Sequence, residues 1–193
     1  MNEHQQQIKV LEKEIFDKQA QLSELRRSDE PEVVSDYELI GPKGKVRLSE
    51  LFGEHTDLIV IHNMGSSCPY CTLWADGFNG MLRHFENRGA FVVVSPDTPD
   101  VQKEFADSRG WHFRMISNGD SGFTEDMGYM REHQGKMGPW PGFSTFHRKE
   151  SGAIHRIAHA SFGPGDPYCG LWHMIGLLKD GAGDWQAKFS YGH

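Results

Sequence analysis

The sequence has little cysteine, no long apolar run and no excess of positive charge. Three of its 193 residues are cysteines, too few and too odd a number for a disulfide scaffold. No apolar stretch approaches the ~20 residues of a membrane span, and the N-terminal segment carries no apolar core of a secretory signal. Lys and Arg number 20 against 27 Asp and Glu, which gives a net charge of −7. We therefore expect a cytoplasmic protein that binds neither nucleic acid nor membrane.

Glycine, tryptophan and proline are missing from residues 1–30, which are rich in Gln, Glu, Lys and Leu. This composition predicts a helical arm over 1–30, with its helix from about 3 to 27, before an α/β domain over 31–193. The apolar residues of the arm form a heptad seam, in which Lys18 fills the skipped position: Ile8, Leu11, Ile15, Leu22 and Leu25. Such a seam suits a homodimer through this helix. About three heptads with a lysine are marginal alone, so we favour slightly an arm packed on its own domain.

Buried strands and amphipathic helices alternate after residue 57. The patterns predict a small hairpin at 37–48 and then, in chain order, a strand at 58–62, a helix at 72–87, a strand at 90–95, a helix at 98–110, a strand at 112–117, a hairpin at 143–159 and a helix at 168–178. This order predicts a parallel core with an antiparallel edge, and hence a three-layer α/β/α sandwich with a mixed sheet. Residues 118–142 are rich in glycine and are expected to be mostly loop, with one short helix near 123–127.

The sequence Cys68-Pro69-Tyr70-Cys71 lies between the first buried strand and its helix. At such a junction, unpaired backbone N–H groups and the helix dipole favour a thiolate and lower a thiol pKa from ~8.5. Cys68 is the expected nucleophile and Cys71 the resolving thiol, acting on a protein or small-molecule thiol or disulfide. Two other readings remain: half of a zinc site, which lacks a second C-x-x-C, and a pair of inert buried cysteines.

Three further residues are candidate neighbours of this cysteine pair. Cys169 is expected as the third residue of a helix capped by Asp166, either as a second resolving thiol or, as we favour, a small buried residue. His62, six residues before Cys68, is a candidate for tuning the thiolate, although a structural role is favoured. Trp74 is a candidate for the wall of a pocket near the pair, although a position in the core is favoured. We expect no cofactor and no metal site.

Four motifs carry a resemblance to a known family. They are the N-terminal helix, Cys68-Pro-x-Cys71 with Trp74-Ala75-Asp76, the strand 143–148, and Phe162-x-Pro164-Gly165-Asp166-x-x-Cys169-x-x-Trp172-His173. Together they resemble the bacterial thioredoxin-like family catalogued as domain of unknown function 899. The stretch 37–53 is similar to the opening of peroxiredoxin-like members of the thioredoxin superfamily. The resemblance implies a thioredoxin fold with an N-terminal helical extension and implies little about the substrate.

Two departures from better-known relatives bear on function. Peroxiredoxins keep Pro-x-x-x-Thr-x-x-Cys, whereas Ile61 and Gly65 stand at those places before Cys68. A thiol–disulfide oxidoreductase is therefore the main hypothesis, with a peroxiredoxin-like thiol peroxidase and a non-enzymatic binding protein as alternatives. Thioredoxin-fold enzymes also place a cis-proline beside the cysteines, before the third core strand. Pro141 is the nearest candidate for that proline.

Overall fold

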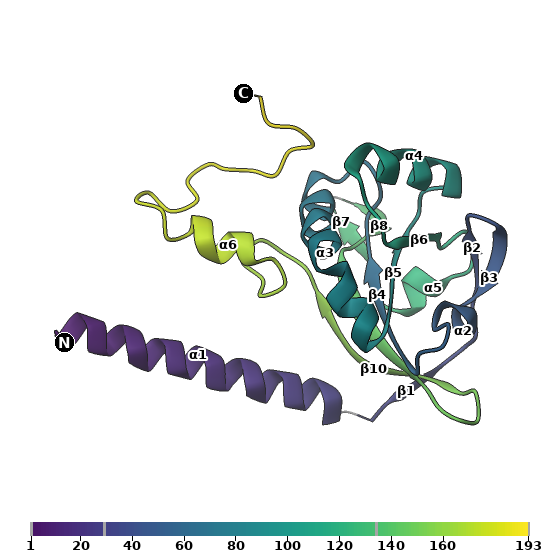
Figure 1. Ribbon diagram of the computed structural model, residues 1–193, viewed down its shortest axis with the longest axis horizontal. Coiled ribbons are helices and arrows are strands. Elements are labelled where there is room, and N and C mark those ends of the chain that lie inside the picture. Colours follow the sequence, from purple (N-terminus) through teal and green to yellow (C-terminus); the bar gives the residue numbers. More distant parts are fainter. Residues whose placement is uncertain (1, 29, 134, 193) are drawn as a thin grey trace.

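The computed structural model describes residues 2–28, 30–133 and 135–192. In chain order its elements are α1 (Glu3–Ser28), β1 (Glu32–Val34), β2 (Glu38–Gly41), β3 (Gly44–Arg47), α2 (Leu48–Leu51), β4 (Asp57–His62), α3 (Pro69–Arg88), β5 (Ala90–Ser95), α4 (Pro99–Arg109), β6 (Arg114–Ser117), α5 (Phe123–Asp126), β7 (Met130–His133), β8 (Lys136–Pro139), β9 (Gly142–Arg148), β10 (Ile154–Ser161) and α6 (Gly170–Ile175). Figure 1 shows their arrangement. None of the described helices is long and apolar enough to cross a membrane.

One mixed sheet carries the domain. In the described part of the chain its strand order is β1-β10-β9-β4-β5-β6-β2-β3. β4, β5 and β6 run parallel to one another, whereas β9 runs antiparallel to both β4 and β10. β4 and β5 read as nearly continuous apolar runs because both of their faces are covered. The predicted parallel core with an antiparallel edge is confirmed.

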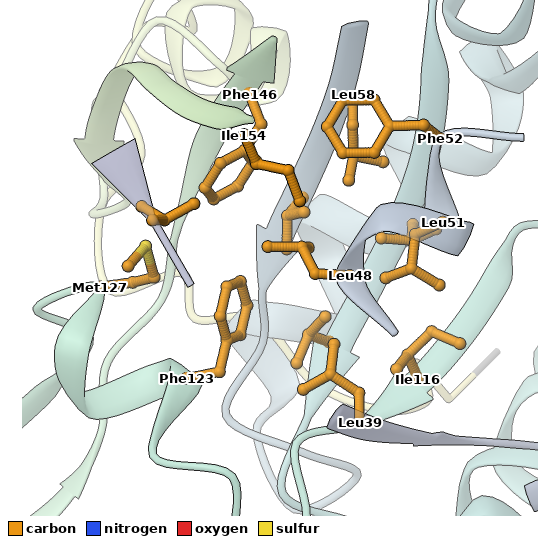
Figure 2. Packing of buried hydrophobic residues seen from close by; sticks show 14 of the residues in the cluster. Leu39, Leu48, Leu51, Phe52, Leu58, Ile116, Phe123, Met127, Phe146 and Ile154 are labelled. Carbon is orange, nitrogen blue, oxygen red and sulfur yellow. The ribbon is translucent and has the colours of Figure 1, made fainter. Parts of the chain in front are cut away.

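Two apolar clusters lie on opposite faces of this sheet. On one face, α3 and α4 pack on the strands, and Trp74, Phe78 and Leu82 of α3 are buried with Phe91 and Val93 of β5. On the other face, α2 and α5 cover a cluster that Figure 2 shows from close by, with the labelled side chains of Leu39, Leu48, Leu51, Phe52, Leu58, Ile116, Phe123, Met127, Phe146 and Ile154. The predicted three-layer sandwich is therefore confirmed.

The helix α1 points away from the sheet (Figure 1), and none of its residues is buried. Its seam residues Ile8, Leu11 and Ile15 are 43%, 57% and 58% exposed. The chain enters the domain through β1, which pairs with β10 at the edge of the sheet, so α1 leaves from that edge. At its C-terminal end, Arg26 Nη1 donates to the Tyr168 hydroxyl at 2.6 Å. The expectation of an arm packed on its own domain was therefore wrong.

Two other local expectations need correction. Residues 118–142 contain the predicted short helix, α5, but also the antiparallel hairpin β7–β8, which was expected to be loop. The last helix is shorter than the predicted 168–178, because an Asx-type turn at Asp166 precedes it: Oδ1 accepts the N–H groups of Tyr168 and Cys169. Helix α6 therefore begins only at Gly170.

Candidate active site

The thiol of Cys68 caps the N terminus of α3. Cys68 has extended backbone angles (φ −102°, ψ 105°), and its Sγ accepts the N–H of Cys71 at 3.1 Å. The N–H and the hydroxyl of Thr72 both donate to the Cys68 carbonyl, at 3.1 and 3.0 Å. Pro69 opens the helix at a position where the N–H would have no helical partner. The sequence thus places one sulfur at the site where helix N–H groups converge.

The two thiols of the pair have opposite electrostatics. The Cys71 thiol donates to the Cys68 sulfur, and the backbone N–H groups of Cys71 and Tyr70 add to its effect. Together they lower the pKa of Cys68 from 9.0 to about 7, although burial opposes them. The same hydrogen bond to Cys68, followed by burial, raises the pKa of Cys71. Cys71 is 3% exposed, whereas Cys68 is only partly buried. Of the two thiols, Cys68 therefore has the lower pKa and the greater exposure.

The loop before Cys68 is held by Asp97, which sequence reasoning missed. Its Oδ2 accepts the N–H of Ser66 at 2.6 Å, and Asn63 Oδ1 accepts the N–H of Gly65 at 2.8 Å. Gly65 has φ +101°, and a Cβ there would lie 3.0 Å from the Asp97 carboxylate oxygens. A threonine here, as in the peroxiredoxin pattern, would therefore be strained at this φ and would require the Asp97 carboxylate to shift. The position of Asp97 just after β5 was a signal in the sequence, because the carboxyl ends of the parallel strands β4 and β5 lie at the same edge of the sheet.

An apolar cavity of about 640 Å³ opens beside Cys68. Its lining residues are largely aromatic or otherwise apolar: Met64, Tyr70, Trp74, Met137, Pro139, Trp140, Pro141, Phe162 and Pro164, with Gly138 and Gly163 and the two cations Arg131 and Lys136. Trp74 stacks on Phe162 with ring centroids 5.4 Å apart and is 3% exposed. Trp74 therefore belongs to the core and also lines the cavity, and Tyr70 lines the cavity beside it.

Pro141 was expected as the cis-proline beside the cysteines. It does line the cavity next to Cys68, and its carbonyl accepts the N–H of Phe162 at 2.9 Å. However, all peptide bonds of the described residues are trans. The placement near Cys68 is confirmed, and the cis assignment was wrong.

His62 does not belong to this site. Its ring stacks on Tyr129 with centroids 3.8 Å apart, and its Nε2 pairs with Ser144 Oγ at 3.1 Å. Both Tyr129 and its neighbour Phe123 belong to the cluster on the sheet face opposite α3. Complete burial lowers the pKa of His62 well below its ordinary value. His62 therefore has the structural role that was favoured and does not tune the thiolate, because alternation along β4 turns its side chain to the other face.

Cys169 is the N-cap of α6 rather than the third residue of a helix, so that expectation was wrong. It is 8% exposed and packs in the same cluster as Trp74 and Phe162. Burial, followed by the charge of Asp166, raises its pKa despite hydrogen bonds from nearby N–H groups. Its thiol is therefore protonated near neutral pH, in keeping with the favoured reading of a small buried residue. Among the described residues, no group of three or more His, Cys, Asp or Glu is placed to hold a metal ion.

The fold is a thioredoxin-like sandwich with a peroxiredoxin-like architecture, and solved structures show the same fold. Peroxidoxin BcpB of Mycobacterium tuberculosis is 24% identical, with a TM-score of 0.54 over 68% of this chain and 84% of that one. A mutant of peroxiredoxin Q from Xanthomonas campestris is 20% identical, with a TM-score of 0.59 over 75% and 92%. A peroxiredoxin-like protein of Aquifex aeolicus is 16% identical, with a TM-score of 0.54 over 68% and 74%.

The family follows from the sequence itself. The model of the family described as bacterial protein of unknown function, DUF899, matches residues 2–189, and the chain belongs to that family. The resemblance drawn from the four motifs is thereby confirmed. Comparison with curated proteins gave no match.

Proposed function

We propose that this protein is a thiol–disulfide oxidoreductase in which Cys68 is the nucleophile and Cys71 the resolving thiol. The Cys68 thiolate attacks one sulfur of a substrate disulfide, forms a mixed disulfide and releases the first substrate thiolate. Cys71 then loses its proton to solvent and attacks the Cys68 sulfur, which releases the second thiolate. Two electrons pass from the cysteine pair to the substrate, and the product is a Cys68–Cys71 disulfide that a cellular dithiol must reduce.

One observation carries this proposal: the pair is electrostatically unequal. The thiol of Cys71 and two backbone N–H groups lower the pKa of Cys68 to about 7. The hydrogen bond to Cys68 and burial raise the pKa of Cys71. An accessible thiolate beside a sheltered thiol is the arrangement that attack and then resolution require. Persistence of the reduced pair requires a reducing compartment, so we also propose that the protein works in the cytoplasm.

The direct test is disulfide reduction with trapping of the intermediate. The wild-type protein should reduce insulin or glutathione disulfide with turnover when dithiothreitol is supplied. Cys71→Ser should stop at a stable mixed disulfide on Cys68, visible by mass spectrometry, and Cys169→Ser should behave as wild type. Mixed-disulfide formation on Cys169, or no reaction in any variant, would contradict the proposal. An unreactive pair would instead favour a non-enzymatic binding protein.

A thiol peroxidase is the second candidate, favoured by the likeness to peroxiredoxin structures. In that reaction the Cys68 thiolate attacks a peroxide oxygen, which breaks the O–O bond, releases alcohol or water and leaves a sulfenic acid. The space taken by Asp97 against Gly65 argues against a peroxide site of the usual pattern. A sulfenate-specific probe distinguishes the candidates: rapid labelling of Cys68 in Cys71→Ser after stoichiometric peroxide would favour the peroxidase.

We also propose that α1 joins two copies of the chain. Its heptad seam is exposed, and a second copy of the same seam presents the matching repeat. Lys18 within the seam should weaken the pairing. Lys18→Leu should therefore tighten the dimer, and Leu11→Glu should dissociate it, as measured by sedimentation equilibrium. The exposed Lys43→Leu in the β2–β3 turn is the control, and monomers in all variants would contradict the pairing.

A further inference from the structure

The cavity beside Cys68 has an uneven chemistry. Most of its wall is apolar and includes four aromatic residues: Tyr70, Trp74, Trp140 and Phe162. Its charged members, Arg131 and Lys136, both come from the hairpin β7–β8, and none of the described carboxylates lines it. We propose that this cavity binds a small aromatic disulfide that bears a carboxylate, and that Cys68 reduces it there. This proposal rests on the proposed oxidoreductase function and names its substrate class.

The size and wall of the cavity favour a small molecule with a flat ring. Its volume of about 640 Å³ falls within the ~300–1,000 Å³ of small-ligand sites. Trp74 lies 6.4 Å from Tyr70 and 5.4 Å from Phe162, measured between ring centroids. Rings at such spacings offer edges and faces on which an aromatic substrate can pack. A polar disulfide such as that of glutathione would leave this surface unmatched.

One of the two cations of the cavity, Arg131, is held in place by contacts of its guanidinium. The Arg131 guanidinium lies 5.2 Å from the ring centroid of Trp140, and its Nη2 donates to Ser161 Oγ at 2.8 Å. These contacts orient the guanidinium and leave other N–H donors for a ligand. Within the described chain, neither Arg131 nor Lys136 forms a salt bridge with an acidic side chain. Two cations beside an apolar wall, neither of them in a described salt bridge, favour a ligand with a carboxylate.

The reaction balances with the cysteine pair alone. The Cys68 thiolate attacks one sulfur of the aryl disulfide, its S–S bond breaks, and one aryl thiolate leaves. Cys71 gives its proton to solvent and displaces the second aryl thiolate from Cys68. Each protein molecule therefore transfers two electrons to one aryl disulfide, releases two aryl thiolates and ends with a Cys68–Cys71 disulfide.

Four disulfides separate the contributions of ring and charge. Dithiobis(nitrobenzoate) is aromatic and anionic, dithiodipyridine aromatic and neutral, dithiodiglycolate anionic without a ring, and hydroxyethyl disulfide neither. Stopped-flow rates with the reduced full-length protein are divided by the rates of the same disulfides with a small thiol, which removes intrinsic reactivity. We expect the normalised rate for dithiobis(nitrobenzoate) to exceed that for hydroxyethyl disulfide roughly tenfold.

Variants assign the preference to the cavity. The double variant Arg131→Gln/Lys136→Gln should lower the ratio of the anionic to the neutral aryl rate roughly fivefold. Trp140→Ala should lower both aryl rates relative to that of hydroxyethyl disulfide. Arg114→Gln is the control. It removes an exposed arginine at the amino end of β6, whereas Cys68 lies at the carboxyl ends of the parallel strands, and it should leave all ratios unchanged.

The outcomes separate this inference from the proposed function. Equal normalised rates for the four disulfides, or ratios that the cavity variants leave unchanged, would overturn the substrate class while Cys68 remains a disulfide reductant. Insulin reduction slowed by Trp140→Ala as much as aryl exchange would assign the cavity to a protein segment and would also overturn it. Failure of Cys68 to react with any disulfide, including hydroxyethyl disulfide, would instead reject the oxidoreductase function itself.

Discussion

Two described helices of this domain have a cysteine as their N-cap, and the thiol pKa is lowered at only one of these cysteines. Cys68 caps α3 with φ −102° and ψ 105°, and Cys169 caps α6 with φ −125° and ψ 103°. The pKa of Cys68 is lowered to about 7, whereas the pKa of Cys169 is raised. Nearly the same backbone position therefore yields opposite thiol chemistry.

The difference lies in what surrounds each sulfur. The Cys68 sulfur accepts two hydrogen bonds from Cys71. One comes from the thiol, and the other comes from the backbone N–H at 3.1 Å. Cys169 has no second thiol, and it lies beside the charge of Asp166 in a buried position. α3 spans 20 residues and α6 only 6. Position at a helix N terminus is thus insufficient, and specific donors without a nearby carboxylate decide the activation.

The largest effect is expected from removing each capping thiol in turn. Cys68→Ser should abolish disulfide reduction, by roughly a thousandfold or more, because the attacking thiolate is lost. Cys169→Ser should retain activity within roughly twofold, because its thiol is protonated and buried. Initial rates of insulin reduction, with circular dichroism to verify folding, measure both. Equal losses in the two variants would erase the distinction between the cysteines.

A smaller effect is expected from removing the thiol that donates to Cys68. Cys71→Ala keeps the backbone N–H but deletes the main cause of the low pKa, so the pKa of Cys68 should rise. Alkylation of Cys68 by iodoacetamide at pH 7 should slow roughly tenfold. Cys169→Ala is the matched control and should leave that rate unchanged. An unaltered rate in Cys71→Ala would assign the activation to the helix itself.

The smallest effect is expected at α6. Asp166→Asn removes the carboxylate charge beside Cys169 and keeps an oxygen that can accept the N–H groups of Tyr168 and Cys169. The pKa of Cys169 should fall slightly, because burial, its larger cause, remains. Alkylation of Cys169 at pH 8, in a background lacking Cys68 and Cys71, should quicken by no more than about threefold. A fall in rate at unchanged thermal stability would contradict this assignment.

The parts of the fold with strong periodicity were predictable. The run 58–62 and the amphipathic helix that follows placed Cys68 at a strand-to-helix junction, as the structure has it. The hairpin β7–β8 escaped prediction because its strands, Met-Arg-Glu-His and Lys-Met-Gly-Pro, show no apolar alternation and few strand-forming residues. Its position matters, since it brings Arg131 and Lys136 to the cavity.

Side-chain direction decides which candidates belong to the site. His62 was a candidate only from its proximity to Cys68 along the chain, and alternation with Leu58 and Val60 places all three on one face of β4, in keeping with the structural role that was favoured. Asp97 and the aromatic wall come together only through tertiary structure, from the ends of different elements. The heptad seam of α1 was readable as a helix, but which surface covers it depends on where the edge strand β1 directs the chain.

The most direct test is the pH dependence of Cys68 reactivity in the Cys169→Ser protein. Because the pKa of Cys68 is lowered from 9.0 to about 7, the thiolate forms as pH rises through 7 and is lost by protonation below it. At pH 7 about half of Cys68 should be thiolate, against ~3% for an ordinary thiol of pKa ~8.5. Alkylation by iodoacetamide, followed by mass spectrometry, should therefore show a midpoint near pH 7. A midpoint at or above pH 9 would contradict the account.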